Sequence, residues 1–218
     1  MNKILSTKKL SVNLKQMVLN SGLSLVDVDF IKVKNLHFTL SELNKTLIFT
    51  SKNAVLSVLE SKNLQQLNKI ECICVGVKTK QLLEQYGFKV IESFINAEEL
   101  AQYIYNNNSK SYTFFSGKIR LNTIPEALKN ASVKYNEVTI YNTSLTSCKI
   151  DSILNGILFF SPSGVASYLK NNKINKEICF CIGKTTAKAL ESKTTNIVIA
   201  EKPSVENVIA EVIEYYKN

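Results

Sequence analysis

The chain has 218 residues, of which 45% are hydrophobic and 21% charged, with seven glycines, three prolines and no biased run. This composition excludes collagenous, low-complexity and disordered chains. The formal net charge of +9 favours an anionic ligand, but lysine supplies nearly all of it and no basic segment is interleaved with aromatic residues, so we expect no nucleic-acid partner.

The first residues carry no export signal. Ser6, Thr7, Lys8 and Lys9 interrupt the opening apolar run, and nowhere do about 18 apolar residues follow one another, so we expect a cytoplasmic protein without membrane contact. The cytoplasm does not sustain structural disulfides, so the five cysteines are expected to be free thiols.

Short apolar runs alternate with segments of helical period along the chain. The first 35 residues fit a strand, a helix over 11–20 that Gly22 ends, and a second strand. Further strands are predicted at 47–50, 72–75, 112–115, 157–160, 178–182 and 196–200, each followed by a turn and a helical pattern. This alternation is typical of an α/β fold with parallel sheets that helices cover on both faces.

Two helices carry specific start signals. Asn96 and Glu99 form a candidate capping box at the start of one helix. The last helix has an apolar stripe from Val205 to Ile213, introduced by the N-cap candidate Ser204. We expect both helices to cover a sheet.

The chain repeats itself. The segment at 47–55 is echoed at 158–165, and the segment at 72–79 is echoed at 179–186. Ser51 and Ser161 are 110 positions apart and Gly76 and Gly183 are 107 apart, each close to half the chain. The repeat predicts two similar α/β domains. Because ligands of open α/β sheets bind outside the carboxyl ends of the strands, we expect the site in a cleft between the domains.

Polar or glycine-containing turns follow the predicted strands in both halves. Backbone N–H groups and hydroxyls at the start of a helix hold anionic groups. Each turn taken alone is better explained by helix capping, but all of them together, at the same end of two sheets, favour a polyanion site. The candidate binding residues are Thr50, Ser51, Gly76, Thr79, Ser116, Gly117, Lys118, Ser161, Ser163, Gly164, Gly183, Lys184, Thr185 and Thr186.

A nucleotide site has little support. The sequence Gly183-Lys184-Thr185 resembles the end of a phosphate loop, but Ile178 occupies the position of its first glycine. No dinucleotide fingerprint occurs either, which argues against a nucleotide-dependent transferase.

The cysteines and the histidine do not indicate a metal. Cys72 and Cys74, like Cys179 and Cys181, are two residues apart, which is not the spacing of a structural zinc site. Residues two apart on a strand point to one face, so we expect small buried hydrophobic side chains there. The single histidine, His37, gives no basis for a catalytic triad.

Tyr141 ends a β-like run near the expected crossover between the domains. It either packs as a half-buried aromatic residue or donates a proton or hydrogen bond to a leaving oxygen from its phenol. The residues around it do not decide between these roles.

The same segments resemble uroporphyrinogen-III synthases from about Leu47 to the end of the chain. The resemblance rests on the order and spacing of several segments and not on one decisive motif. They are IFTSKNAV (48–55), VGVKT (75–79), NAE (96–98), FSG (115–117) with Leu128, VTIYNT (138–143), FFSPSGV (159–165) and IGKTTA (182–187).

This resemblance implies two flavodoxin-like domains joined by a two-stranded connection, with the active cleft between them. The outer domain would comprise 1–33 and 143–218, and the inner, inserted domain 34–142. It also implies an enzyme without a cofactor, a linear tetrapyrrole polycarboxylate as substrate, and transient handover from hydroxymethylbilane synthase. The sequence does not determine the oligomeric state, for which we expect a monomer.

The family's reaction closes hydroxymethylbilane into uroporphyrinogen III with inversion of ring D and loss of water. Among the residues of this chain, the resemblance makes Tyr141 the best candidate to assist loss of the hydroxyl. Thr79, Ser163, Thr185 and Thr186 would bind acetate and propionate groups. Lys118 and Lys184 stand where the family varies, and they either contact carboxylates or are solvated.

A second class of function uses the same features. A non-catalytic two-domain cytoplasmic protein would bind a small polyanion reversibly with the same turns. Turnover distinguishes the two, because only the synthase performs chemistry.

Overall fold

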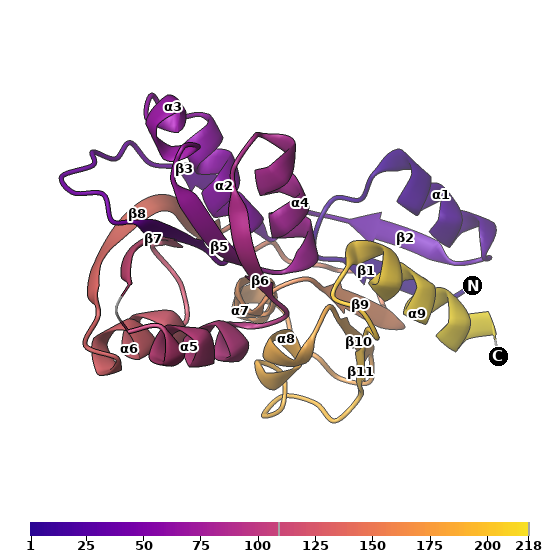
Figure 1. The fold of residues 1–218 in the computed structure, drawn as a ribbon. Coiled ribbons are helices and arrows are strands. Elements are labelled where there is room, and N and C mark those ends of the chain that lie inside the picture. The colour runs from indigo at the N-terminus through magenta and orange to yellow at the C-terminus, as the bar shows by residue number, and fades with distance from the viewer. Residues whose placement is uncertain (109, 218) are drawn as a thin grey trace. The chain divides into compact units, whose positions relative to one another are not determined.

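The computed structural model describes residues 1–108 and 110–217, and both of its compact units have the predicted α/β architecture. The terminal unit comprises Met1–Lys32 and Ser144–Asn218, and the inserted unit comprises Val33–Thr143. The terminal unit thus combines the indigo start and the yellow end of the chain (Figure 1). Among the described residues, no helix has the length and hydropathy needed to cross a bilayer.

The terminal unit is built on a parallel five-stranded sheet of order β11-β10-β9-β1-β2. Its strands are β1 (Lys3–Ser6), β2 (Ser24–Asp27), β9 (Gly156–Phe159), β10 (Ile178–Cys181) and β11 (Ile197–Ile199). Its helices are α1 (Val12–Asn20), α7 (Pro162–Asn171), α8 (Lys184–Lys188) and α9 (Val205–Lys217). Successive strand residues enter opposite cores, so Leu5 packs with α7 and α8 whereas Ile4 packs with α1 and α9.

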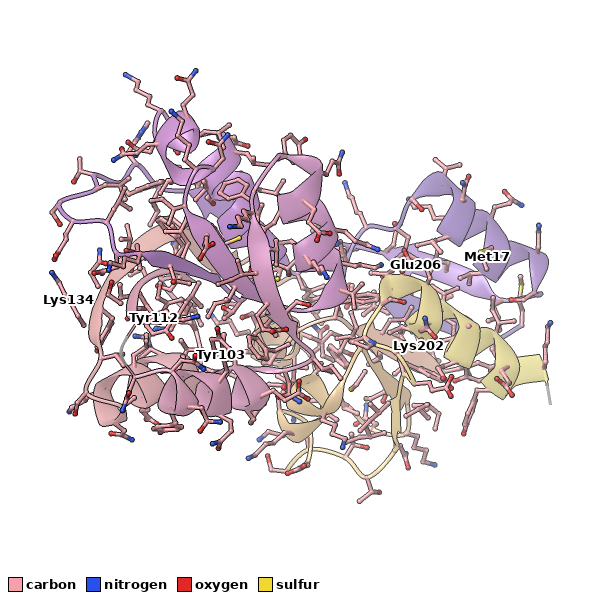
Figure 2. All side chains as sticks on the ribbon, in the orientation of Figure 1. Met17, Tyr103, Tyr112, Lys134, Lys202 and Glu206 are labelled. Carbon is pink, nitrogen blue, oxygen red and sulfur yellow. The ribbon has the colours of Figure 1, made fainter. Side chains whose placement is uncertain are left out.

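The inserted unit has a six-stranded sheet of order β3-β8-β7-β4-β5-β6, in which β4 to β8 are parallel. Its strands are β3 (Ile31–Asn35), β4 (Thr46–Phe49), β5 (Glu71–Val75), β6 (Val90–Phe94), β7 (Ser111–Gly117) and β8 (Lys134–Leu145). Its helices are α2 (Lys52–Leu59), α3 (Leu64–Leu67), α4 (Val77–Gln85), α5 (Ala97–Asn106) and α6 (Thr123–Asn130). Phe49 packs with α2, α3 and α4, whereas Ile48 packs with α5 and α6. Tyr103 of α5 and Tyr112 of β7, labelled in Figure 2, lie in the second of these cores.

The two sheets share one spatial strand order, but the chain enters that order at a different strand in each, so the units are related by circular permutation. The repeat pairs β4 with β9 and β5 with β10, and on this basis β6-β5-β4-β7-β8 matches β11-β10-β9-β1-β2. The helices agree, since α2 and α4 share one core as α7 and α8 do. The turn after β7 therefore corresponds to the turn after β1.

The chain passes between the units within two neighbouring strands, because the unit boundaries fall inside β3 and β8. The N–H of Leu36 donates to the carbonyl of Ile140 at 2.9 Å, and the N–H of Thr146 donates to the carbonyl of Phe30 at 3.0 Å. Residue numbers rise along one strand as they fall along the other. The connection is therefore an antiparallel pair.

The predicted strands and caps are present, with two differences. Ser204 accepts a hydrogen bond from the N–H of Asn207 at 3.1 Å, as expected of an N-cap. Asn96 accepts from the N–H of Glu99 at 2.8 Å, but the Glu99 carboxylate bonds the N–H of Ile95 and not that of Asn96, as a regular capping box would require. Strand β6 was not predicted, because none of its residues is buried and its apolar run is short.

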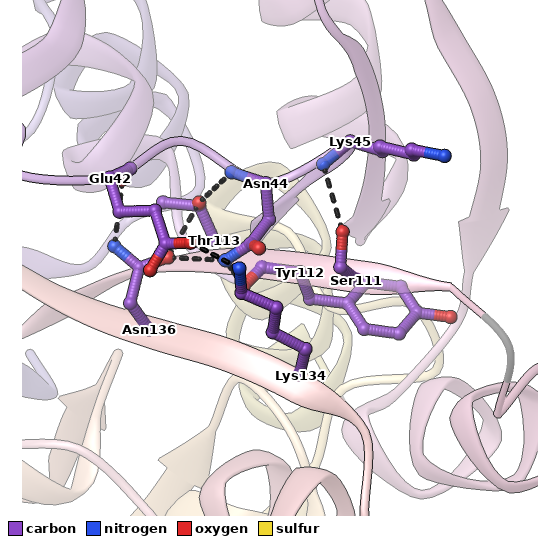
Figure 3. Close-up of polar contacts among 8 residues, drawn as sticks. All are labelled: Glu42, Asn44, Lys45, Ser111, Tyr112, Thr113, Lys134 and Asn136. Carbon is purple, nitrogen blue, oxygen red and sulfur yellow. Dashed lines mark hydrogen bonds and ion pairs between the residues drawn. The ribbon is translucent and has the colours of Figure 1, made fainter.

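A buried polar network joins the amino ends of β4, β7 and β8 (Figure 3). The side-chain amide of Asn44 donates to the carbonyl of Tyr112 at 2.8 Å and to Oδ1 of Asn136 at 2.7 Å. The N–H of Asn44 donates to Oγ1 of Thr113 at 3.0 Å, and that hydroxyl donates to Asn136 at 2.8 Å. The network holds the long 36–45 segment on the sheet at the edge opposite the carboxyl ends of these strands.

We expect Asn44→Ala to lower the free energy of unfolding by about 1 to 3 kcal/mol, because the buried Tyr112 carbonyl loses its donor. Equilibrium denaturation in urea measures the change. Asn20→Ala is the matched control, since the Asn20 side chain bonds Gln16 on the exposed surface of α1, and its effect should stay within about 0.5 kcal/mol. Equal small effects of both substitutions would contradict a stabilising role for the network.

Candidate functional site

The predicted binding turns of the inserted unit lie together where the carboxyl ends of β4, β5 and β7 meet, because these strands are parallel. We call this side of a sheet its carboxyl edge, or simply its edge. Ser51 is the N-cap of α2, and its Oγ accepts from the N–H of Asn53 at 3.0 Å. Gly76 takes the N-cap position of α4, whose first turn holds the buried Thr79. The residues gathered at this edge are Thr50, Ser51, Gly76, Thr79, Ser116, Gly117 and Lys118.

Tyr141 joins this edge from β8. Its hydroxyl donates to Oγ of Ser51 at 3.3 Å, and its ring lies against Gly117. Only 8% of Tyr141 is exposed, so the ring packs in the core while the hydroxyl lies at the edge. Ser116 and Gly117, expected in a turn, are instead the last residues of β7 and are buried.

The terminal unit presents a second such edge. Ser161 is the N-cap of α7 and accepts from the N–H of Gly164 at 3.0 Å, with Pro162 at the first helical position. Gly183 takes the N-cap position of α8, where Lys184 and Thr185 are exposed and Thr186 is buried. The residues gathered here are Ser161, Ser163, Gly164, Gly183, Lys184, Thr185 and Thr186.

The turn after β1 belongs to this second edge and was missed. Oγ1 of Thr7 donates to the carbonyl of Leu158 at 2.7 Å. The N–H groups of Lys9 and Leu10 already donate to the carboxylates of Asp29 and Asp27, so only the ammonium groups here remain for an anion. The signal lay in the internal repeat, because the sheet places β1 beside β9 although about 150 residues separate them in the sequence.

The two glycines that the repeat equates differ in backbone. Gly76 has a φ of +89°, a left-handed conformation that side chains rarely adopt. Gly183 has a φ of 176°, which is extended backbone open to any residue, and a methyl group there would meet no atom within 4 Å. The fold therefore requires glycine at the first position and not at the second.

The one arginine is engaged within the inserted unit. Arg120 binds both carboxylate oxygens of Glu137, at 2.6 and 2.8 Å, and donates to Asn122 at 2.6 Å. Burial alone would raise the pKa of Glu137, but the hydrogen bonds and charge of Arg120 hold that pKa below its ordinary value. Lys118 and Lys184 make no ion pair within 1–108 and 110–217, and both are exposed beside predicted binding turns.

The cysteines lie in the cores and not at either edge. Cys72 and Cys74 enter one core and Cys179 and Cys181 another, which confirms that each pair points to one face. Burial raises the pKa of Cys72, Cys179 and Cys181 to about 12 and that of Cys74 to about 11, so these thiols stay protonated. No group of three potential metal ligands occurs in the part of the chain that the structure describes.

Comparison with known proteins agrees with this architecture. Residues 14–210 match the model of a family described as uroporphyrinogen-III synthase HemD. A curated relative, the porphyrin biosynthesis protein HemD of Ruminiclostridium josui, is 25% identical over an alignment of 190 residues that covers 77% of this chain and 37% of the relative. The chain thus spans little more than a third of that relative's length.

Two solved structures share the fold. Uroporphyrinogen-III synthetase from Helicobacter pylori has a TM-score of 0.74 and 21% identity, covering 99% of this chain and 100% of that one. A mutant uroporphyrinogen III synthase from Thermus thermophilus has a TM-score of 0.72 and 10% identity, covering 100% of this chain and 98% of that one. At such identities the likeness establishes the fold alone.

We expect Glu137→Gln to flatten the dependence of stability on pH in acid. Because the folded-state pKa of Glu137 is depressed, its contribution is fully present above the unfolded value of about 4.3 and is lost as pH falls through the folded value. Urea denaturation in steps from about pH 7 to pH 3 should show a larger loss of unfolding free energy for the wild type.

The matched control for this measurement is Glu191→Gln, at an exposed carboxylate without an ion pair in the described chain. It should keep the wild-type slope. At pH 7 the Glu137 variant should be about 2 kcal/mol less stable, since it loses a charged hydrogen-bond pair. Parallel slopes for the wild type and Glu137→Gln would show that the pair adds no acid-sensitive stability.

Proposed function

We propose that this chain, which belongs to the uroporphyrinogen-III synthase HemD family, closes hydroxymethylbilane into uroporphyrinogen III with inversion of ring D and loss of water. The observation that carries the proposal is the family match over residues 14–210, a range that includes Tyr141 and every predicted binding turn. The alternative function is reversible binding of a polyanion without chemistry. No described feature of the chain favours it over the synthase reaction.

The two sheet edges suit a substrate with eight carboxylates. In each unit, helix starts present N–H groups and hydroxyls where the macrodipole favours negative charge. Exposed lysines stand beside these turns, and the +9 charge of the chain raises the local concentration of anions. We propose that these turns bind acetate and propionate groups of the substrate, with the hydroxyls of Thr79, Ser163, Thr185 and Thr186 and the first-turn N–H groups as donors.

In the proposed reaction, the terminal hydroxyl of the bilane leaves as water together with a pyrrole N–H proton, and the substituted carbon of ring D then attacks the resulting electrophilic azafulvene. The spiro intermediate then fragments and recloses with that ring inverted. Tyr141 assists the departure by donating a hydrogen bond to the leaving oxygen, because a phenol is a stronger acid than the alcohols around it. The remaining catalysis is orientation, since the protein must bring the less accessible carbon to the electrophile.

We also propose that the protein acts as a cytoplasmic monomer that receives its substrate from hydroxymethylbilane synthase by transient handover. Hydroxymethylbilane closes without an enzyme to the uninverted isomer, so a short transit protects the yield of isomer III. The proposal involves no cofactor, nucleic acid or membrane.

Purified protein supplied with hydroxymethylbilane, generated in situ by hydroxymethylbilane synthase, should produce isomer III well above a control without the protein. Oxidation of the products and chromatographic separation of the porphyrin isomers measures the ratio. If folded protein gives isomer I alone, the synthase assignment is rejected, and reversible polyanion binding becomes the better account.

We expect Tyr141→Phe to lower kcat by about tenfold to a hundredfold with little change in KM, because the phenol acts on the leaving group and not on substrate binding. Initial rates of isomer III formation measure both constants. Tyr135→Phe is the matched control, since Tyr135 lies at the opposite end of β8 and is 36% exposed. Wild-type kcat for Tyr141→Phe would leave Tyr141 with a packing role only.

A further inference from the structure

Gly117 is the position where a side chain would collide with Tyr141. A methyl group added to Gly117 would lie 2.5 Å from Cζ, 2.6 Å from Cε2 and 2.8 Å from Oη of Tyr141. The backbone conformation at Gly117 does not itself require glycine, because Gly117 is not among the described glycines with positive φ, which are Gly22, Gly76 and Gly87. What excludes a side chain at 117 is the tyrosine.

A β-bulge brings Tyr141 over this glycine. Ser116 pairs with Thr139, but Gly117 pairs with Tyr141, so Ile140 is an extra residue on β8. Ile140 and Tyr141 consequently enter the same core, whereas consecutive residues of a regular strand point to opposite faces. The bulge turns the phenol toward the carboxyl edge of the sheet.

The backbone of Tyr141 is held in place, so a clash at Gly117 must be relieved by the ring. The N–H of Lys118 donates to the Tyr141 carbonyl at 2.9 Å, and the N–H of Leu36 donates to the Ile140 carbonyl at 2.9 Å, so neighbouring strands hold this backbone on both sides. The hydroxyl donates to Ser51 at the far end of the ring, and the residue is 8% exposed. A methyl group at 117 therefore displaces the ring and its hydroxyl.

The terminal unit serves as an internal comparison. Its corresponding turn, Ser6-Thr7-Lys8-Lys9, has no glycine, and the buried aromatic residue that follows β2 is Phe30, which packs on Tyr168 of α7 and carries no hydroxyl. Because both sheets have the same spatial strand order, and the terminal unit forms this turn without glycine, the fold itself does not require glycine here. Glycine occurs in the unit that also carries the tyrosine.

We infer that Gly117 is a positioning residue for the proposed cyclisation, which acts by leaving the space in which the Tyr141 phenol is aimed at the sheet edge. This inference rests on the proposed function and on the role given there to Tyr141. It assigns to Gly117 an effect through the phenol in place of a contact with the substrate.

A double-mutant cycle on activity tests the inference. Gly117→Ala should lower kcat for isomer III by about tenfold to a hundredfold, the range for a misplaced catalytic group, with KM nearly unchanged. In the Tyr141→Phe background the same change should lower kcat by less than about twofold, because the hydroxyl is already absent. An equal loss in both backgrounds would overturn the inference, since a substrate contact or a general structural role predicts that result.

A second cycle on thermal stability needs neither activity nor a well-folded Gly117→Ala protein. Leucine at 141 lacks Cε2, Cζ and Oη, so Gly117→Ala combined with Tyr141→Leu should unfold at the same temperature as Tyr141→Leu alone. Gly117→Ala by itself should unfold at a lower temperature than the wild type or fail to fold. Equal losses in the wild-type and Tyr141→Leu backgrounds would show that the methyl group does not meet the ring, and the inference would fail.

Gly156→Ala is the matched control. This glycine of β9 is also crowded, since a methyl group there would lie 3.1 Å from side-chain atoms of Ile4, Phe180 and Tyr216. It should lower the unfolding temperature while its effect on kcat per folded molecule stays independent of Tyr141→Phe. If wild-type protein forms only isomer I, the proposed function fails, and the stability cycle still reports separately on the packing of Gly117.

Discussion

Parallel strand pairing is the constraint on which the rest of this structure depends. Parallel neighbours need a crossover connection, so strands β1, β4, β5, β6, β7, β9, β10 and β11 are each followed by a turn or loop and then a helix. That rule brings Ser51 beside the turn at Gly76 in the inserted unit, and Ser161 beside the turn at Gly183 in the terminal unit. Helix N-termini and polar turns thus accumulate at one edge of each sheet without any long motif in the sequence.

The circular permutation explains how one chain builds two such sheets. The inserted unit is continuous, whereas the terminal unit takes β1 and β2 from the start of the chain and β9 to β11 from its end. Pairing of Leu5 with Ile157 closes the terminal sheet, so its stability depends on contacts of very high sequence separation. The antiparallel pair β3 and β8 carries the chain in and out of the inserted unit, and β8 also carries Tyr141.

Charge is distributed so that the lysines, and not the arginine, are open to an anion. Arg120 uses its planar fork on Glu137 and Asn122, which anchors the segment after β7. Lys184 is exposed at the start of α8 and Lys118 is exposed in the segment between β7 and α6. Their flexible ammonium groups adapt to carboxylates in many geometries. Such a surface suits a flexible polycarboxylate better than a ligand that needs a fixed bidentate partner.

The sequence by itself determined the α/β class, the main strands, the helix caps and the gathering of polar turns, because these follow from local periodicity, turn chemistry and an internal repeat. It did not reveal β6, whose residues are only partly buried, or the site turn at Thr7, whose partner strand is about 150 residues away. The tertiary structure alone decided where the phenol of Tyr141 points. Its aim depends on a one-residue bulge between β7 and β8 and on the empty space over Gly117, and register between strands is a property of their pairing that neither strand encodes alone.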